Sequence, residues 1–342
     1  MNKSPYDEAL RQLLDSNAQL DVEGKGTTNH CPMALCALAG MGAGPERLQA
    51  FFDMWVRRFG LPAPEITMRV DAQNWTEMTG NAAAFGALRA YFAHWIVRSG
   101  ANAVVAQVLG RVPFAPASGA FHALIRLGYG LEAEHSGEIA AGLAALVSRN
   151  LPINMQSVER RRAASVHEGW AALSNALNGA VFSDDLISSR LRAVASEPLF
   201  GAHLLAPPEH AGLLDEMAHA ALALYWKTNS FTVMHMVTGL FATRQVFAHI
   251  PGTLAQRLLP DVWAALCAAY VSIGAPPVAA DELALPVDPV AAGEQVAWPE
   301  LLQLAIASDD DHVIKMTFTC WREYQRQPSS LYLLAAKRVI KS

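Results

Sequence analysis

Four histidines in apolar segments are the residues of this sequence best suited to chemistry. They are His30, His122, His235 and His312. A lone histidine on an apolar face is more often a hydrogen-bonded core residue than a ligand, because any polar partner satisfies its ring. Four buried imidazoles without partners would be costly, whereas one shared divalent metal satisfies them all. We therefore predict a metal site, and imidazole ligands are compatible with iron, zinc, copper or nickel.

The segment from Asp309 to Met316 concentrates the most polar chemistry. Asp309 or Asp310 is placed to cap the helix that follows, and carboxylates favour its positive N-terminal end. His312 and Lys315 are three residues apart and therefore share one helix face. One interpretation is a capped surface helix with solvated charges, since His and Lys are usually exposed. The apolar neighbours of Lys315 favour a buried lysine instead, which makes it a fifth candidate ligand.

A lysine ligand requires a change in the chemistry of its amine. A protonated ammonium has no lone pair and is repelled by a metal cation. Lys315 can ligate the metal only if its amine is neutralised, or if CO2 converts it to a carbamate with an anionic oxygen. We favour the carbamate, because four histidines supply no negative charge. The competing interpretation is a lysine that points away and pairs with Asp309, Asp310 or Asp311.

Composition excludes several classes of function. The chain has 342 residues, 52% hydrophobic and 17% charged, which is enough for a large core. With a net charge of -5 and no Lys/Arg block, nucleic acid is not an expected partner. The longest uncharged runs, 228–243 and 262–280, are too short or too interrupted to span a bilayer. The polar start lacks a signal-peptide core, so we expect a cytoplasmic protein without a membrane partner, of undetermined oligomeric state.

Apolar residues recur every three or four positions almost throughout, which predicts an all-α protein. We expect one large helical domain over 1–342, with 274–299 as a surface loop and not a domain linker. The four cysteines lack CxxC spacing and are expected to be reduced core residues. The expected helices are 5–17, 31–40, 45–59, 82–98, 119–133, 137–148, 157–177, 185–195, 210–227, 231–249, 254–273, 299–307, 311–326 and 329–340.

Several segments together resemble the questin oxidase-like family, which includes fungal enzymes of anthraquinone and aflatoxin-type polyketide pathways. The segments follow one another in family order, and those around His122 and His312 are the most specific. The matching stretches are 29–35, 75–80 with Tyr91-Phe92 after it, 119–129, 235–238 and 310–315.

The resemblance implies an all-helical oxygenase that opens an aromatic polyketide ring, in a reaction described as Baeyer-Villiger-like and NADPH-dependent. The sequence has no nucleotide-binding fingerprint: the glycines from Gly40 to Gly44 follow a helix instead of a strand. It does carry histidines at the matching positions. We therefore prefer non-haem Fe(II) chemistry, with O2 as co-substrate, NADPH as a possible reductant and zinc as a possible substitute metal.

Two further residues are candidate catalytic groups that meet an aromatic small-molecule substrate. Arg126 lies one turn after His122 and either pairs with a substrate phenolate or makes a structural ion pair. Tyr129 belongs to the aromatic residues proposed for a flat apolar pocket, with Trp75, Phe121 and Trp226. Two alternatives remain open: an NADPH-dependent oxidase without a bound metal, and a non-catalytic helical protein that binds an aromatic metabolite.

Overall fold

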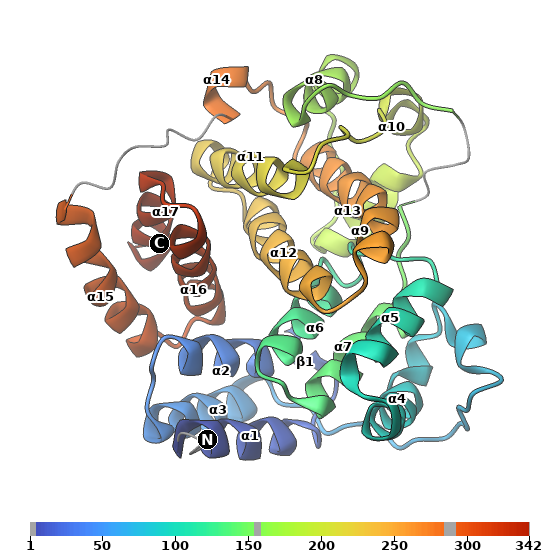
Figure 1. The fold of residues 1–342 in the computed structure, drawn as a ribbon, viewed down its shortest axis with the longest axis vertical. Helices are drawn as coiled ribbons and strands as arrows, with labels where there is room; N and C mark the ends of the chain where they lie inside the picture. The colour runs from blue at the N-terminus through green and yellow to red at the C-terminus, as the bar shows by residue number, and fades with distance from the viewer. Residues whose placement is uncertain (1–4, 154–158, 284–291, 342) are drawn as a thin grey trace.

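Figure 1 shows the fold, a computed structural model that describes residues 5–153, 159–283 and 292–341, with side chains described from residue 8 onward and outside 284–297. Within these residues the regular structure is helical except for one antiparallel hairpin. Its strands are β1 (Glu23–Gly24) and β2 (Thr27–Thr28), and Glu23 pairs with Thr28. The predicted all-α class is confirmed.

The helices of the first half include a closely packed pair, α6 and α7, whereas α8 lies apart from that pair (Figure 1). They are α1 (Pro5–Asn17), α2 (Cys31–Gly40), α3 (Pro45–Phe59), the 3-10 turns η1 (Trp75–Met78) and η2 (Ala82–Ala84), α4 (Phe85–Ser99), α5 (Ala101–Arg111), α6 (His122–Glu132), α7 (Ser136–Ser148) and α8 (Val166–Leu177). The helices of the second half are α9 (Ile187–Ala195), α10 (Pro198–His203), α11 (Leu213–Thr228), α12 (Phe231–Ala248), α13 (Gly252–Ser272), α14 (Ala280–Leu283), α15 (Ala292–Ala307), α16 (Asp311–Arg326) and α17 (Ser330–Lys341).

Helix α6 lies at the centre of the fold because none of its faces is exposed to solvent. Every residue from His122 to Leu131 is buried, and α6 packs on α2, α7 and α12. A helix that is buried on every face requires neighbours on every side, and its Arg126 requires a buried partner. The contact with α12 is close: a Cβ at Gly128 would lie 2.9 Å from the Cα of Ala242. Helix α16 completes the set by packing on both α2 and α12.

The observed helices agree with the predicted ones in part. Helices α1, α2, α3 and α16 have the predicted bounds, whereas α5, α10 and α14 were not expected. The predicted helix 157–177 is wrong at its start: α8 begins only at Val166, and Arg162 instead forms a parallel bridge to Ala206. Residues 154–158, at the start of that prediction, lie outside the described residues.

The stretch 274–299 differs from the expected surface loop. Helix α14 and the first half of α15 fall within it, and 284–291 lie outside the described residues. Buried apolar residues from Leu13 to Val339 form one cluster, so the described residues make a single domain. The domain bounds 1–342 stay a prediction. Among the described helices, none combines the length and apolar character that crossing a membrane requires.

Asp261 on α13 gives a pH-dependent test of this packing. Burial raises the pKa of its carboxyl to about 6, above the ordinary 3.8, so folding favours the protonated form. The stabilisation that the protonated Asp261 carboxyl gives the folded state is fully present below pH 3.8 and is lost as the pH rises through 6. After allowance for partial exposure, Asp261→Asn should stabilise the protein by about 1 kcal/mol at pH 7. Urea unfolding at pH 7 and pH 4 measures this gain.

The gain of Asp261→Asn should shrink toward pH 4, where the wild-type carboxyl is itself neutral. Asp185→Asn is the control, because it removes a carboxylate from an exposed position. A stability difference for Asp261→Asn that does not change between the two pH values would contradict the argument.

Candidate metal centre

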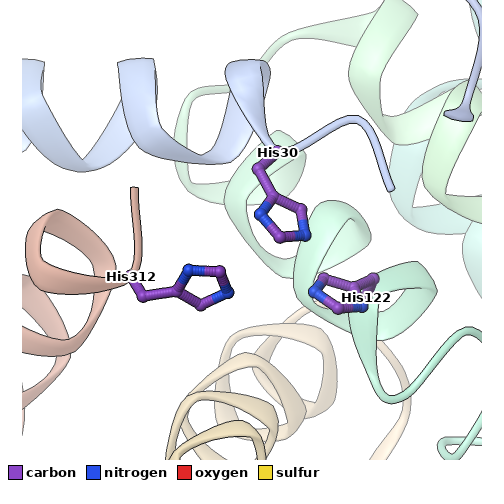
Figure 2. A group of neighbouring side chains, drawn as sticks. All are labelled: His30, His122 and His312. Carbon is purple, nitrogen blue, oxygen red and sulfur yellow. The ribbon is translucent and has the colours of Figure 1, made fainter. Parts of the chain in front are cut away.

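The four predicted histidines come together at the N-terminal ends of four helices. His30 is the N-cap residue of α2, His122 opens α6, and His312 lies in the first turn of α16. Figure 2 shows these three rings turned toward one another. Their ligand-competent nitrogens lie within 4.8 Å of one another. His235, in the second turn of α12, places its Nε2 3.2 Å from the Nε2 of His122.

Backbone carbonyls fix the proton positions on two of the rings. The Nδ1 of His122 lies 2.5 Å from the carbonyl oxygen of Gly119. The Nδ1 of His235 lies 2.8 Å from the carbonyl oxygen of Phe231. A carbonyl oxygen only accepts, so both Nδ1 atoms carry the proton and donate it. In a neutral imidazole, the Nε2 then carries a bare lone pair.

The environment keeps these two imidazoles neutral. Burial lowers the pKa of His122 and of His235 well below the ordinary value, and neighbouring imidazoles lower both further. Two bare Nε2 atoms therefore face each other at 3.2 Å with no proton between them. Facing lone pairs repel, and a cation between them turns the repulsion into ligation. This pair is the strongest geometric argument for a metal.

The other two histidines meet on one carboxylate. The Oδ1 of Asp311 lies 2.7 Å from the Nδ1 of His30, 3.2 Å from the Nδ1 of His312 and 2.8 Å from the Nζ of Lys315. Burial raises the pKa of Asp311, but Lys315 and His30 outweigh it and hold that pKa well below its ordinary value. Asp311 is therefore ionised and acts as the shared acceptor.

His30 and His312 also direct unused nitrogens inward. Burial, with Lys315 second, lowers the pKa of His30 to about 4, so its ring is neutral and its Nδ1 donates to Asp311. Within the described residues, the Nε2 atoms of His30 and His312 are buried without a hydrogen-bond partner. A ligating histidine ordinarily donates its other nitrogen to a carboxylate or carbonyl. His30, His122 and His235 show that arrangement, and the Nδ1 of His312 lies 3.2 Å from the Asp311 carboxylate.

The loop before His122 explains why the predicted helix 119–133 begins three residues late. Gly119, Ala120 and Phe121 have φ values of 57°, 56° and 70°. Left-handed backbone is strained at alanine and phenylalanine, and such strain gathers at functional sites. The loop is held by Phe121, whose ring packs where a Cβ at Gly239 would come within 2.9 Å. It brings the Gly119 carbonyl within hydrogen-bond distance of the His122 Nδ1.

Arg126 adopts the second of the two arrangements expected for it. Its Nε and Nη2 bind the two carboxylate oxygens of Glu138 at 2.6 and 3.0 Å, and both side chains are buried. Asn17 adds a weaker hydrogen bond of 3.4 Å to Glu138. This is a structural ion pair that joins α6 to α7. Contact between Arg126 and a substrate phenolate stays a prediction.

The aromatic candidates lie in different places. Tyr129 is buried with its ring beside Phe241 and Phe318, and burial raises the pKa of its hydroxyl. Trp226 lies at the surface beneath the guanidinium of Arg338. Trp75 is buried in a separate aromatic group around Phe92. Phe121 lies next to His122, and a catalytic role for Tyr129 stays a prediction.

A cavity of about 10 Å³ adjoins the histidines, and it is lined by Ile125, Met234, His235, Thr238, His312 and Lys315. Sequence reasoning missed the roles of two residues beside the histidines. Asp311 was expected only as one of three carboxylates that could pair with Lys315, and its contacts with His30 and His312 were not predicted. Phe231 carried no signal, because a single phenylalanine at the start of an apolar helix resembles a core residue.

The chain resembles a known protein family over most of its length. The family model described as questin oxidase-like matches residues 27–320. The chain belongs to the questin oxidase-like family. All four histidines, Asp311 and Lys315 lie within the matched part. No curated protein matches the chain. Membership of the family suggests an oxidoreductase that acts on aromatic polyketide substrates.

The Arg126–Glu138 pair generates a stability prediction. Arg126→Met leaves the Glu138 carboxylate buried without its cation and should destabilise the protein by about 3 kcal/mol. Adding Glu138→Gln removes the stranded charge, so the double variant should regain most of that loss. Chemical denaturation of the three proteins measures both effects. Wild-type stability in Arg126→Met alone would show that the ion pair does not hold α6 on α7.

Proposed function

We propose that this protein is a non-haem iron oxygenase that opens the ring of an aromatic polyketide or quinone-type substrate. The observation that supports it is a set of four imidazoles, three of them buried, whose Nδ1 atoms face acceptors. The Nε2 atoms of His122 and His235 face each other at 3.2 Å. His30, His122, His235 and His312 would hold the metal. Divalent iron, when bound, supplies the means to activate O2 toward an electron-rich ring.

The protein's own groups orient the imidazole ligands and exclude water from the site. The carbonyls of Gly119 and Phe231 and the carboxylate of Asp311 keep the lone pairs pointed inward before any metal arrives. Preorganised ligands of this kind need no rearrangement on binding. The buried imidazoles exclude water from the place where the aromatic ring of the substrate would react. Exclusion of water limits hydrolysis and side reactions.

Charge balance favours an anionic substrate or ligand. Neutral histidines contribute no charge, and the negative charge of Asp311 is offset by Lys315 at 2.8 Å. A divalent ion in that surrounding retains its positive charge, which attracts an anion in a low-dielectric site. Phenols and hydroxyquinones ionise to such anions. We therefore propose a substrate that presents a phenolate oxygen to the centre.

Lys315 has two competing roles. Its ammonium pairs with Asp311, which is the arrangement expected of a lysine that is not a ligand. Yet it is buried and lines the cavity beside His235 and His312, as a carbamate ligand would require. The carbamate remains our proposal for Lys315, because it would itself provide the missing negative charge to the metal. The phenolate argument applies where Lys315 stays an ammonium paired with Asp311.

Loss of a ligand should remove bound iron. We expect His122→Ala and His235→Ala, purified without oxygen, to lose most of their iron, because each removes one of two facing lone pairs. His219→Ala is the matched control, since His219 is a partly buried histidine on α11. Elemental analysis and O2 uptake with a hydroxyanthraquinone are the measurements. Full activity in the iron-free protein, with no gain on adding Fe(II), would contradict iron chemistry.

Substitution of Lys315 separates its two roles. If a carbamate ligates the metal, Lys315→Met should lose iron and Lys315→Glu should regain part of it, because glutamate returns an anionic oxygen. Iron content per chain is the measurement. Wild-type iron content in both variants would assign Lys315 to the ion pair with Asp311 alone.

A further inference from the structure

Phe231 covers the histidine centre on one side. It is the first residue of α12, and its ring centroid lies 4.7 Å from those of both His235 and His312. The rings meet at 76° and 61°, which are edge-to-face contacts. Phe231 is nevertheless 51% exposed. One side of the ring therefore rests on the two imidazoles while the other side meets solvent.

The space beneath Phe231 is too small for an aromatic substrate. Met234, His235 and Thr238 follow Phe231 on the same helix face, at spacings of three, four and seven. These three residues line the cavity of about 10 Å³ beside His312. That volume accommodates about one water molecule, whereas ligand pockets enclose roughly 300 Å³ or more. A ring-bearing substrate reaches the centre only when a side chain in or over this wall moves.

Phe231 does not line this cavity, but its ring rests on two residues that do, His235 and His312, and it can move without opening the core. Ile125, Thr238 and Lys315 are buried within helices, and Lys315 is bound to Asp311. Phe231 lies in the first helical turn, and its side chain already extends halfway into solvent. Rotation about its side-chain bonds would uncover His235 and His312 without opening the core. The backbone carbonyl of Phe231 would keep its hydrogen bond with the Nδ1 of His235.

We propose that Phe231 is the gate and the size-determining residue of the centre, and that a planar aromatic substrate takes the place of its ring over His235 and His312. This inference rests on the proposed function for the identity of the substrate. The position of the ring and its control of access do not depend on a bound metal. An aromatic ring suits the vacated position, since the Phe231 ring already makes edge-to-face contacts with both imidazoles there.

Histidine modification of the metal-free protein tests the gate without requiring activity. Diethyl pyrocarbonate acylates accessible neutral imidazoles, and peptide mass spectrometry reports the rate at each histidine. Phe231→Ala should accelerate modification of His312 and His235 by about tenfold, since two ring contacts no longer oppose exposure. Leu199→Ala, which removes another exposed apolar side chain on α10, should leave both rates unchanged.

Rates in Phe231→Ala within about twofold of wild type would overturn the gate. Phe231→Leu keeps an apolar side chain at the same position and should give an intermediate rate, so a folding defect in the alanine variant does not remove the test. The Co(II)-loaded protein then tests size selection through its visible spectrum. Phe231→Ala should bind 2-naphtholate more tightly relative to phenolate than the wild type does, and an unchanged ratio would overturn the size-determining role.

The two accounts fail in distinguishable ways. If no Co(II) or iron binds while Phe231→Ala still accelerates histidine modification, the metal proposal fails and the gate stands. If the metal binds and the modification rates do not change, the metal proposal stands and the gate fails.

Discussion

The centre depends on where the imidazole protons lie. The carbonyls of Gly119 and Phe231 and the carboxylate of Asp311 face Nδ1 atoms, so Nε2 lone pairs converge in a space that burial keeps nearly dry. Such an arrangement is unfavourable without a cation, because facing lone pairs repel and buried acceptors lack donors. A protein that only required a stable core would be more stable with apolar residues at these positions. The geometry is therefore best explained by a ligand that carries positive charge.

The helix ends around the centre add an electrostatic constraint. Three of the four histidines lie at helix N-termini, where the helix dipole contributes positive potential. That potential would weaken cation binding. Asp311 offsets it from within the first turn of α16. Its contact with Lys315 then limits the negative charge available to a metal, which leaves room for an anionic ligand.

The sequence predicted the parts of the site that depend on local context. The four histidines were visible as polar residues in apolar segments, and Asp310 caps α16 through the backbone N–H groups of His312 and Val313, one of the two caps expected. Long-range pairings were not visible. Glu138 as the partner of Arg126, and His30 as the partner of Asp311, depend on how α2, α6, α7 and α16 pack, and no spacing in the chain encodes that packing. The left-handed loop before His122 was likewise hidden, because two of its three residues are not glycine.

The most direct measurement of the central claim is long-range 1H–15N NMR of the histidine side chains during titration with Zn(II), a diamagnetic substitute for iron. The account predicts that His30, His122 and His235 begin as neutral rings protonated at Nδ1. The Nε2 signals of these rings and of His312 should then shift together and saturate at one metal per chain. Rings protonated at Nε2, or Nε2 signals that do not move as zinc is added, would contradict it.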